Sequence, residues 1–185
     1  MQENRVALDT DFINKITKYE KRDPAALFRD IFDALGKTPV VHPFIVEHEL
    51  MYNKVALDLI EQGFIQKIPY EEFLPNEDAE ARTFYTTMFR ELNQKITGCS
   101  LSEQTNIFGS YAKHSFGEVH TVLMAVELGI PLFYSNDGGA KVAAVAYAEG
   151  RLVVQNIEEV VEQLQDSDKI SGKEKRYLRN KRKRP

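Results

Sequence analysis

The sequence predicts an α/β protein with three layers, α/β/α, around a mostly parallel central sheet. Short apolar segments without alternation, such as residues 6–8, are typical of strands that are buried on both faces of such a sheet. These segments alternate along the chain with others whose apolar residues recur at helical spacing. The 185 residues, 43% of them hydrophobic, suffice for one domain with a packed core.

Capping residues, prolines and glycines mark where the predicted elements begin and end. Asp23 and Pro24 are typical of a helix start, and Gly36, Gly63 and Gly98 are typical of helix ends. The first part of the chain then contains a strand at 5–9, helices at 10–19, 24–35 and 43–62, a strand at 64–68, a connection at 69–75, a helix at 76–97, and a segment at 101–112 that is either helix or loop. The last part contains a helix at 117–128, a strand at 130–134, a turn at 135–139, a helix at 140–149, a strand at 151–154 and a helix at 157–164.

The charges are unevenly distributed, with an acidic body and a basic end. Residues 173–185 carry eight Lys and Arg and one Glu, whereas residues 1–172 carry 16 Lys and Arg against 27 Asp and Glu. An acidic surface repels nucleic acid and a basic one attracts it. We therefore divide the chain into a domain at 1–167 and a basic C-terminal tail at 168–185. Such a tail is typically solvated and flexible, and a compatible second interpretation is an RNA-binding arm.

Composition also excludes several classes of protein. The sequence contains no run of 18 apolar residues, so we expect no membrane span, and the first residues do not resemble a secretory signal. Cys99 is the only cysteine, so we expect neither an internal disulfide nor a Cys-rich zinc site, and no paired base accompanies it for nucleophilic chemistry. These observations predict a cytoplasmic protein.

Several carboxylates occur at or near the carboxyl ends of the predicted strands. In open α/β sheets, functional sites lie at these strand ends. Asp9 follows the first strand, Asp137 follows the strand at 130–134, and Glu118 begins the helix before that strand. Glu49 lies in a predicted helix together with Glu47. These two acids face different directions, so only one of them can face the strand ends. Because converging carboxylates repel one another, such a cluster favours a divalent cation with oxygen ligands. The sequence therefore predicts a Mg²⁺ or Mn²⁺ site.

Each acid also has a purely structural interpretation. Asp9 and Asp11 could cap the following helix, and Glu118 could satisfy backbone N–H groups of a first helical turn. Asp137 could form a turn, and Glu49 could lie on a solvated helix surface. The four histidines have no tight ligand spacing, so we expect surface or partly buried positions for His42, His48, His114 and His120.

Three motifs in order, VALDTDFI, EHEL and GEVHTVLMAVELGIPLFYSNDGGAKVAA, resemble those of PIN-domain ribonucleases. The resemblance covers residues 4–165, apart from an extended, unplaced segment at 63–112, and implies that 1–167 is a PIN-like nuclease domain that hydrolyses RNA with Mg²⁺ or Mn²⁺. The site that it implies consists of Asp9, Glu49, Glu118 and Asp137, with support from Asp11, Ser135 and Asn136. It also implies a toxin-type endoribonuclease with an antitoxin or other protein partner, and a homodimer.

Two other functions fit parts of the sequence. Residues 6–11 also resemble the opening of haloacid-dehalogenase-type phosphatases, in which Asp9 would be the nucleophile and Asp11 the acid/base. Phe12 and Ile13, however, stand where that family has Gly and Thr. The other alternative is a PIN-like module that binds RNA or a protein without cutting. An acyl-phosphate trapped on Asp9 would favour the phosphatase, and a silent Mn²⁺ titration would favour the binding module.

Overall fold

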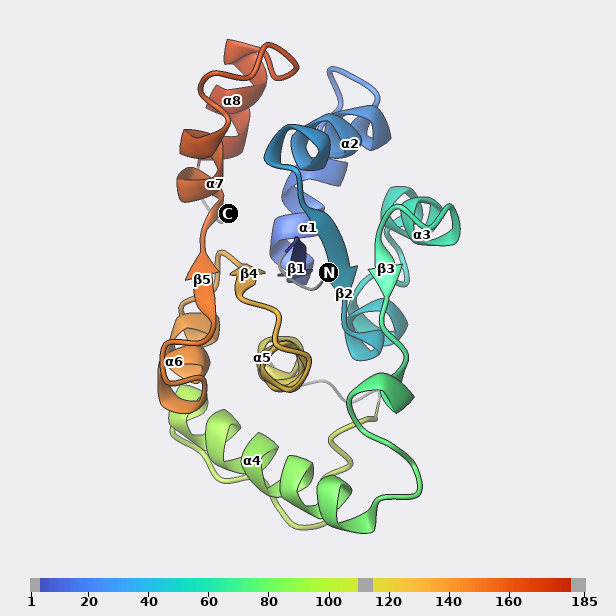
Figure 1. The fold of residues 1–185 in the computed structure, drawn as a ribbon, viewed down its shortest axis with the longest axis vertical. Coiled ribbons are helices and arrows are strands. Elements are labelled where there is room, and N and C mark those ends of the chain that lie inside the picture. The colour runs from blue at the N-terminus through green and yellow to red at the C-terminus, as the bar shows by residue number, and fades with distance from the viewer. Residues whose placement is uncertain (1–3, 110–114, 181–185) are drawn as a thin grey trace.

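The computed structural model describes residues 4–109 and 115–180. Five strands form one all-parallel sheet in the order β3-β2-β1-β4-β5, with helices on both faces, which confirms the predicted α/β/α layers (Figure 1). The strands are β1 (Arg5–Leu8), β2 (Thr38–Val41), β3 (Gln66–Lys67), β4 (Leu132–Tyr134) and β5 (Val153–Gln155). The α-helices are α1 (Thr10–Thr17), α2 (Pro24–Leu35), α3 (Lys54–Glu61), α4 (Ala79–Thr97), α5 (Phe116–Glu127), α6 (Gly138–Tyr147), α7 (Ile157–Gln163) and α8 (Gly172–Arg179). A π-helical turn, η1 (Ile45–Glu49), and a 3₁₀ turn, η2 (Tyr70–Glu72), complete the described elements.

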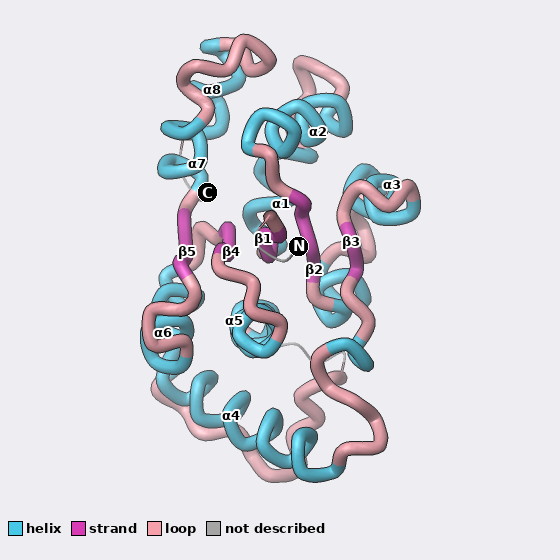
Figure 2. Tube along the Cα trace, viewed as in Figure 1, coloured by secondary structure: helices cyan, strands magenta, loops and turns pink. Residues whose placement is uncertain are grey.

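Strand β1 lies at the centre of the sheet, and its successive residues face opposite helical layers. Val6 and Leu8 belong to the apolar core that contains residues of α1, α2, α3 and α7, whereas Ala7 belongs to the core formed with α4, α5 and α6. All three side chains are fully buried, which explains why the segment shows no polar alternation. Figure 2 shows the two helical layers on either side of the strands.

Most of the predicted helix ends are confirmed by their caps. The side chain of Asp23 accepts a hydrogen bond from the amide of Ala25, and Pro24 is the first residue of α2. Gly36 and Gly98 follow α2 and α4 with φ angles of +61° and +72°, a conformation in which glycine carries no Cβ penalty. The described residues 101–109 form turns and loop without helix or strand.

The predicted helix at 43–62 is wrong, because the chain bends in its middle. The amide of Leu50 donates to the carbonyl of Ile45, five residues earlier, at 2.9 Å and so closes the π-helical turn η1. Asn53 then caps a separate helix, α3, by accepting from the amide of Ala56 at 3.0 Å. Strand β2, which the sequence did not predict, directly precedes this region.

Part of the basic end of the chain forms a helix, α8. Ser171 and Glu174 form a reciprocal capping box at the start of α8, and Leu178 is fully buried in the core that contains α1 and α7. Residues 172–179 of the basic tail therefore form a helix that packs on the domain with one face and is exposed on the other, while residues 181–185 lie outside the described range. No helix among the described residues is both long enough and apolar enough to cross a membrane.

Candidate functional site

Asp9 and Ser135 lie side by side because they follow neighbouring parallel strands. The hydroxyl of Ser135, after β4, donates to Oδ2 of Asp9, after β1, at 2.8 Å. The other carboxylate oxygen of Asp9 accepts from the amide of Thr10 at 2.7 Å, so Asp9 is the N-cap of α1. The helix-capping interpretation is thus correct for Asp9 and wrong for Asp11, which lies exposed in the first turn. Asp9 itself is buried at the carboxyl edge of the sheet.

Glu49 reaches the same edge from the π-helical turn η1. The hydroxyl of Thr10 donates to its carboxylate, and the backbone of Gly117 also hydrogen-bonds to it. Glu47, two residues earlier, points elsewhere and bonds to Lys67 at 2.7 Å. As the sequence predicted, only one acid of this segment faces the strand ends, and it is Glu49.

Two further carboxylates come from the starts of α5 and α6. Glu118 lies in the first turn of α5, and Asp137 is the N-cap of α6, where its Oδ1 accepts from the amide of Gly139 at 2.6 Å. The charge of Asp137 acts on Glu118, and the charge of Glu118 acts on Asp9. The four acids predicted for the site therefore interact electrostatically at one edge of the sheet.

Burial and mutual repulsion raise the pKa values of these acids. Burial raises the pKa of Asp9 well above its ordinary value, and the charges of Glu118, Glu49 and Asp11 raise it further, against the hydrogen bond from Ser135. Burial, followed by the charges of other carboxylates, raises the pKa of Glu118 to about 7. Burial also raises the pKa of Glu49, although its bond from Thr10 opposes this.

The donor set of this cluster fits a hard divalent cation. Carboxylate oxygens are the ligands that Mg²⁺ and Mn²⁺ prefer. Among residues 4–109 and 115–180, however, no three His, Cys, Asp or Glu side chains are arranged so that they could hold an ion as they stand. Both oxygens of Asp9 and one of Asp137 also accept hydrogen bonds. Binding an ion therefore requires these side chains to exchange hydrogen bonds for metal contacts.

Of the supporting residues, Ser135 contacts the acids and Asn136 does not. The Ser135 hydroxyl bonds to Asp9 and also accepts from the amide of Asp137 at 3.1 Å. Asn136 is exposed, and its side-chain carbonyl accepts from the amide of Ile157 at 2.9 Å, which ties the end of β4 to the start of α7. Asn136 is thus a structural residue of this turn in the described geometry.

Two residues of the site were missed by sequence reasoning, Thr10 and Gly117. Thr10 orients Glu49 through its hydroxyl, and nothing in the sequence signals this contact. A Cβ at Gly117 would lie 2.5 Å from Oε1 and 3.0 Å from Cδ of Glu49, so the carboxylate can approach only a glycine. A glycine in the first turn of a helix, where it is a poor helix former, was the available signal for such an approach.

The Gly117→Ala substitution is expected to displace Glu49 and to reduce any metal-dependent activity of the cluster about 10- to 100-fold. The global stability should change by no more than about 1 kcal/mol, because the clash meets a flexible side-chain end and alanine favours the helix. Thermal unfolding and single-turnover assays measure the two effects. Gly172→Ala is the matched control, since a Cβ there meets nothing within 4 Å. Full activity in Gly117→Ala would show that the position of Glu49 is unimportant.

The expectation of surface or partly buried histidines is wrong for His42 and His120, which are fully buried in an aromatic cluster, and is confirmed for His48, which is partly buried. The amide of Phe44 donates to Nδ1 of His42, which leaves the proton on Nε2. Nε2 of His120 faces the carbonyl of Ile107 at 2.9 Å and must therefore carry its proton. Nε2 of His48 lies 3.2 Å from the carbonyl oxygen of Phe108. His114 lies outside the described residues.

These tautomers make Tyr85 the link between the two buried rings. Nε2–H of His42 donates to the Tyr85 hydroxyl at 3.4 Å, and that hydroxyl donates to Nδ1 of His120 at 2.7 Å. Burial lowers the pKa of His120 to about 3 and that of His42 well below its ordinary value, so both rings are neutral. Since Tyr85 and Ile107 belong to the segment at 63–112, this network attaches that segment to α5, the helix of Glu118.

Comparisons with known proteins assign no family to this chain. No protein-family model matches it, and neither a curated protein nor a solved structure does so. The chemistry of the site is therefore argued from its own residues.

Proposed function

We propose that this protein is a metal-dependent ribonuclease that hydrolyses RNA phosphodiester bonds at the carboxylate cluster. The observation that carries the proposal is that Asp9, Glu49, Glu118 and Asp137 come from four separate elements and interact at the carboxyl edge of the sheet. Their raised pKa values and the mutual repulsion of the carboxylates favour an ion over a purely structural role. The same four acids are those that the PIN-domain resemblance selects.

Each residue has a defined task in this proposal. Asp9, Glu49, Glu118 and Asp137 would hold Mg²⁺ or Mn²⁺, which would activate water and stabilise the charge that develops on the phosphate. Ser135 and Thr10 orient the carboxylates of Asp9 and Glu49 through their hydroxyls. In the metal-free protein the pKa of Glu118 is about 7, so binding of an ion near neutral pH would displace a proton from this carboxyl group.

The remaining implications of the resemblance belong to the same proposal. They are a toxin-type role with an antitoxin or other protein partner, and a homodimer; a cytoplasmic location is proposed with them on the basis of composition. Cys99, the one cysteine, is free and exposed, as suits a reducing compartment.

Incubation of the purified protein with end-labelled single-stranded RNA tests the proposal. Cleavage products are expected with Mn²⁺ or Mg²⁺ and none in EDTA. Intact RNA with every divalent cation tried, despite Mn²⁺ binding in calorimetry, would contradict the ribonuclease. A silent titration together with RNA binding would instead favour the non-catalytic binding module.

A further inference from the structure

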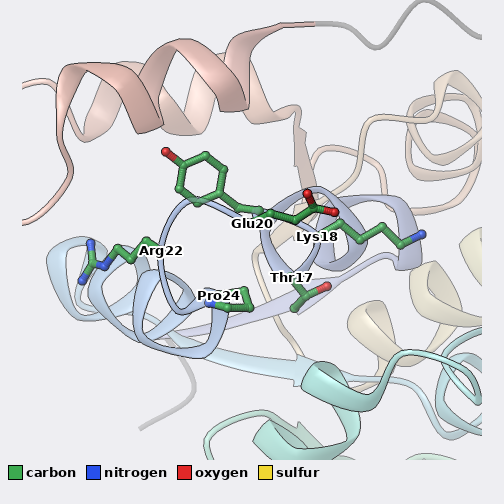
Figure 3. Close-up of a pocket in the computed structure, with 6 residues that line it drawn as sticks. Thr17, Lys18, Glu20, Arg22 and Pro24 are labelled. Carbon is green, nitrogen blue, oxygen red and sulfur yellow. The ribbon is translucent and has the colours of Figure 1, made fainter.

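Helix α8 lies antiparallel to α1 and to the loop that follows it. Near the start of α8, Glu174 forms an ion pair with Arg22 at 3.3 Å. At its end, the carbonyl of Asn180 accepts from Nζ of Lys15 at 2.5 Å. Figure 3 shows the labelled Arg22 and Lys18 spread along this loop beneath the pale red helix. From the start of α8 to its end, the contacted residue therefore changes from Arg22 to Lys15, which shows that the two segments run in opposite directions.

One face of α8 fixes the helix in this position. Leu178 is fully buried, and the ring of Tyr177 packs on Tyr19 with centroids 4.7 Å apart. The ammonium group of Lys15 lies 4.9 Å from the centroid of the same Tyr177 ring. Because these contacts anchor the helix, its opposite face has a defined orientation.

That opposite face is a stripe of exposed cations. Lys173, Arg176 and Arg179 recur at every third residue and are all exposed. Within the described parts of the chain, none of the three forms an ion pair with an acid. Guanidinium and ammonium groups on one helix face suit the phosphates of an extended strand.

The end of α8 lies closer to the carboxylates than its start. Lys15, the partner of Asn180, follows Asp11 by four residues on α1, about 6 Å along the helix axis. Asp9 caps the beginning of that same helix. The stripe of cations therefore runs along α1 in the direction of the acid cluster, and the sequence continues with four more Lys and Arg at 181–184.

We propose that the exposed face of α8 binds the phosphate backbone of single-stranded RNA and directs the strand along α1 to the carboxylates. The choice of RNA rests on the proposed function. The charge distribution supports it, because the 16 Lys and Arg of residues 1–172 are outnumbered by 27 Asp and Glu, so the body repels a polyanion. The basic helix offsets this repulsion at a fixed place beside the site.

RNA binding measured by fluorescence anisotropy tests the inference. The probe is a fluorescein-labelled single-stranded RNA, titrated in EDTA at salt concentrations from 50 to 200 mM so that no cleavage occurs. The double variant Arg176→Gln, Arg179→Gln should lower the slope of log K against log salt by about 1.4 and weaken binding about tenfold at 0.15 M salt. The matched control is Arg5→Gln, Arg151→Gln, whose arginines lie at the first residue of β1 and two residues before β5, and it should bind like the wild type.

Unchanged binding by the α8 variant, or an equal loss in the control variant, would overturn the inference. Binding of anionic phosphatidylserine vesicles through α8 without any effect on RNA would overturn it as well. Circular dichroism verifies that both variants are folded. Because binding is measured without metal, α8-dependent binding by a protein that never cleaves would refute the ribonuclease alone. Metal-dependent cleavage with α8-independent binding would refute the inference alone.

Discussion

Replacement of Asp9 by Asn is expected to reduce metal-dependent RNA cleavage at least about 100-fold. Loss of a group that only orients a metal ligand lowers metal affinity or activity about 10- to 100-fold. Asp9 is proposed as a ligand itself, so its loss should have a larger effect. Asn preserves the cap of α1, since Asn and Asp are equally good N-caps. Removal of a buried carboxylate that Glu118 and Glu49 repel should also raise the thermal midpoint of the metal-free protein at neutral pH. Single-turnover cleavage and thermal unfolding measure these opposite effects.

Glu47→Gln is the matched control for this experiment. Glu47 lies in the same π-helical turn as Glu49 but bonds to Lys67 at the surface, so its loss should leave cleavage unchanged. Equal cleavage by the wild type and Asp9→Asn would show that the activity lies outside this cluster. An acyl-phosphate on Asp9 of the wild type, trapped with a fluoride-type phosphate analogue, would favour the phosphatase.

The second large effect concerns pH: Glu118→Gln should gain stability relative to the wild type as pH rises. Glu118 ionises near 4.5 when unfolded and at about 7 when folded, so its favourable contribution is complete below pH 4.5 and is lost as pH rises through 7. Between pH 5 and pH 8 the wild type should therefore lose about 2 kcal/mol relative to the variant. Urea unfolding of both proteins in EDTA at each pH measures the difference.

Comparison of the two proteins removes an opposing contribution from the histidines. His42 and His120 have lowered pKa values, so their neutral burial costs stability as pH falls below 6.5, equally in both proteins. Addition of Mn²⁺ should raise the wild-type midpoint more at pH 8 than at pH 5, because metal binding requires ionised ligands. A constant difference in stability across pH would contradict the raised pKa of Glu118.

The sequence predicted four of the five strands, most directly β1 and β4, whose apolar residues are mostly buried and show no polar alternation. It did not predict β2, whose second residue, Pro39, argues against a central strand. The structure accommodates this proline, since β3 pairs with β2 only from Val40 onward. The break between η1 and α3 was also unpredictable, because both segments bury apolar residues at nearly helical spacing and a π-helical turn leaves no clear pattern.

For the site, sequence order identified the acids but not the contacts that hold them. That Asp9 and Glu118 lie close enough to interact followed from their places at strand and helix ends. The choice of Glu49 over Glu47 depends on the π-helical turn and on the glycine beside it, which only the fold reveals. The buried histidines could not be predicted, because Tyr85 and its neighbours come from a segment without a recognisable motif.

The hydrogen bond between Asp9 and Ser135 joins residues 126 positions apart and so constrains the order of folding. Strand β1 is central, yet one of its two neighbours, β4, comes from the last third of the chain. Closing a loop of this length is slow, and long-range parallel pairing is typical of slowly folding domains. Until β4 docks, the apolar residues of β1 stand at an open edge with which other strands can pair. The pairing of β4 with β1, which brings Ser135 to Asp9, therefore also closes this edge of β1.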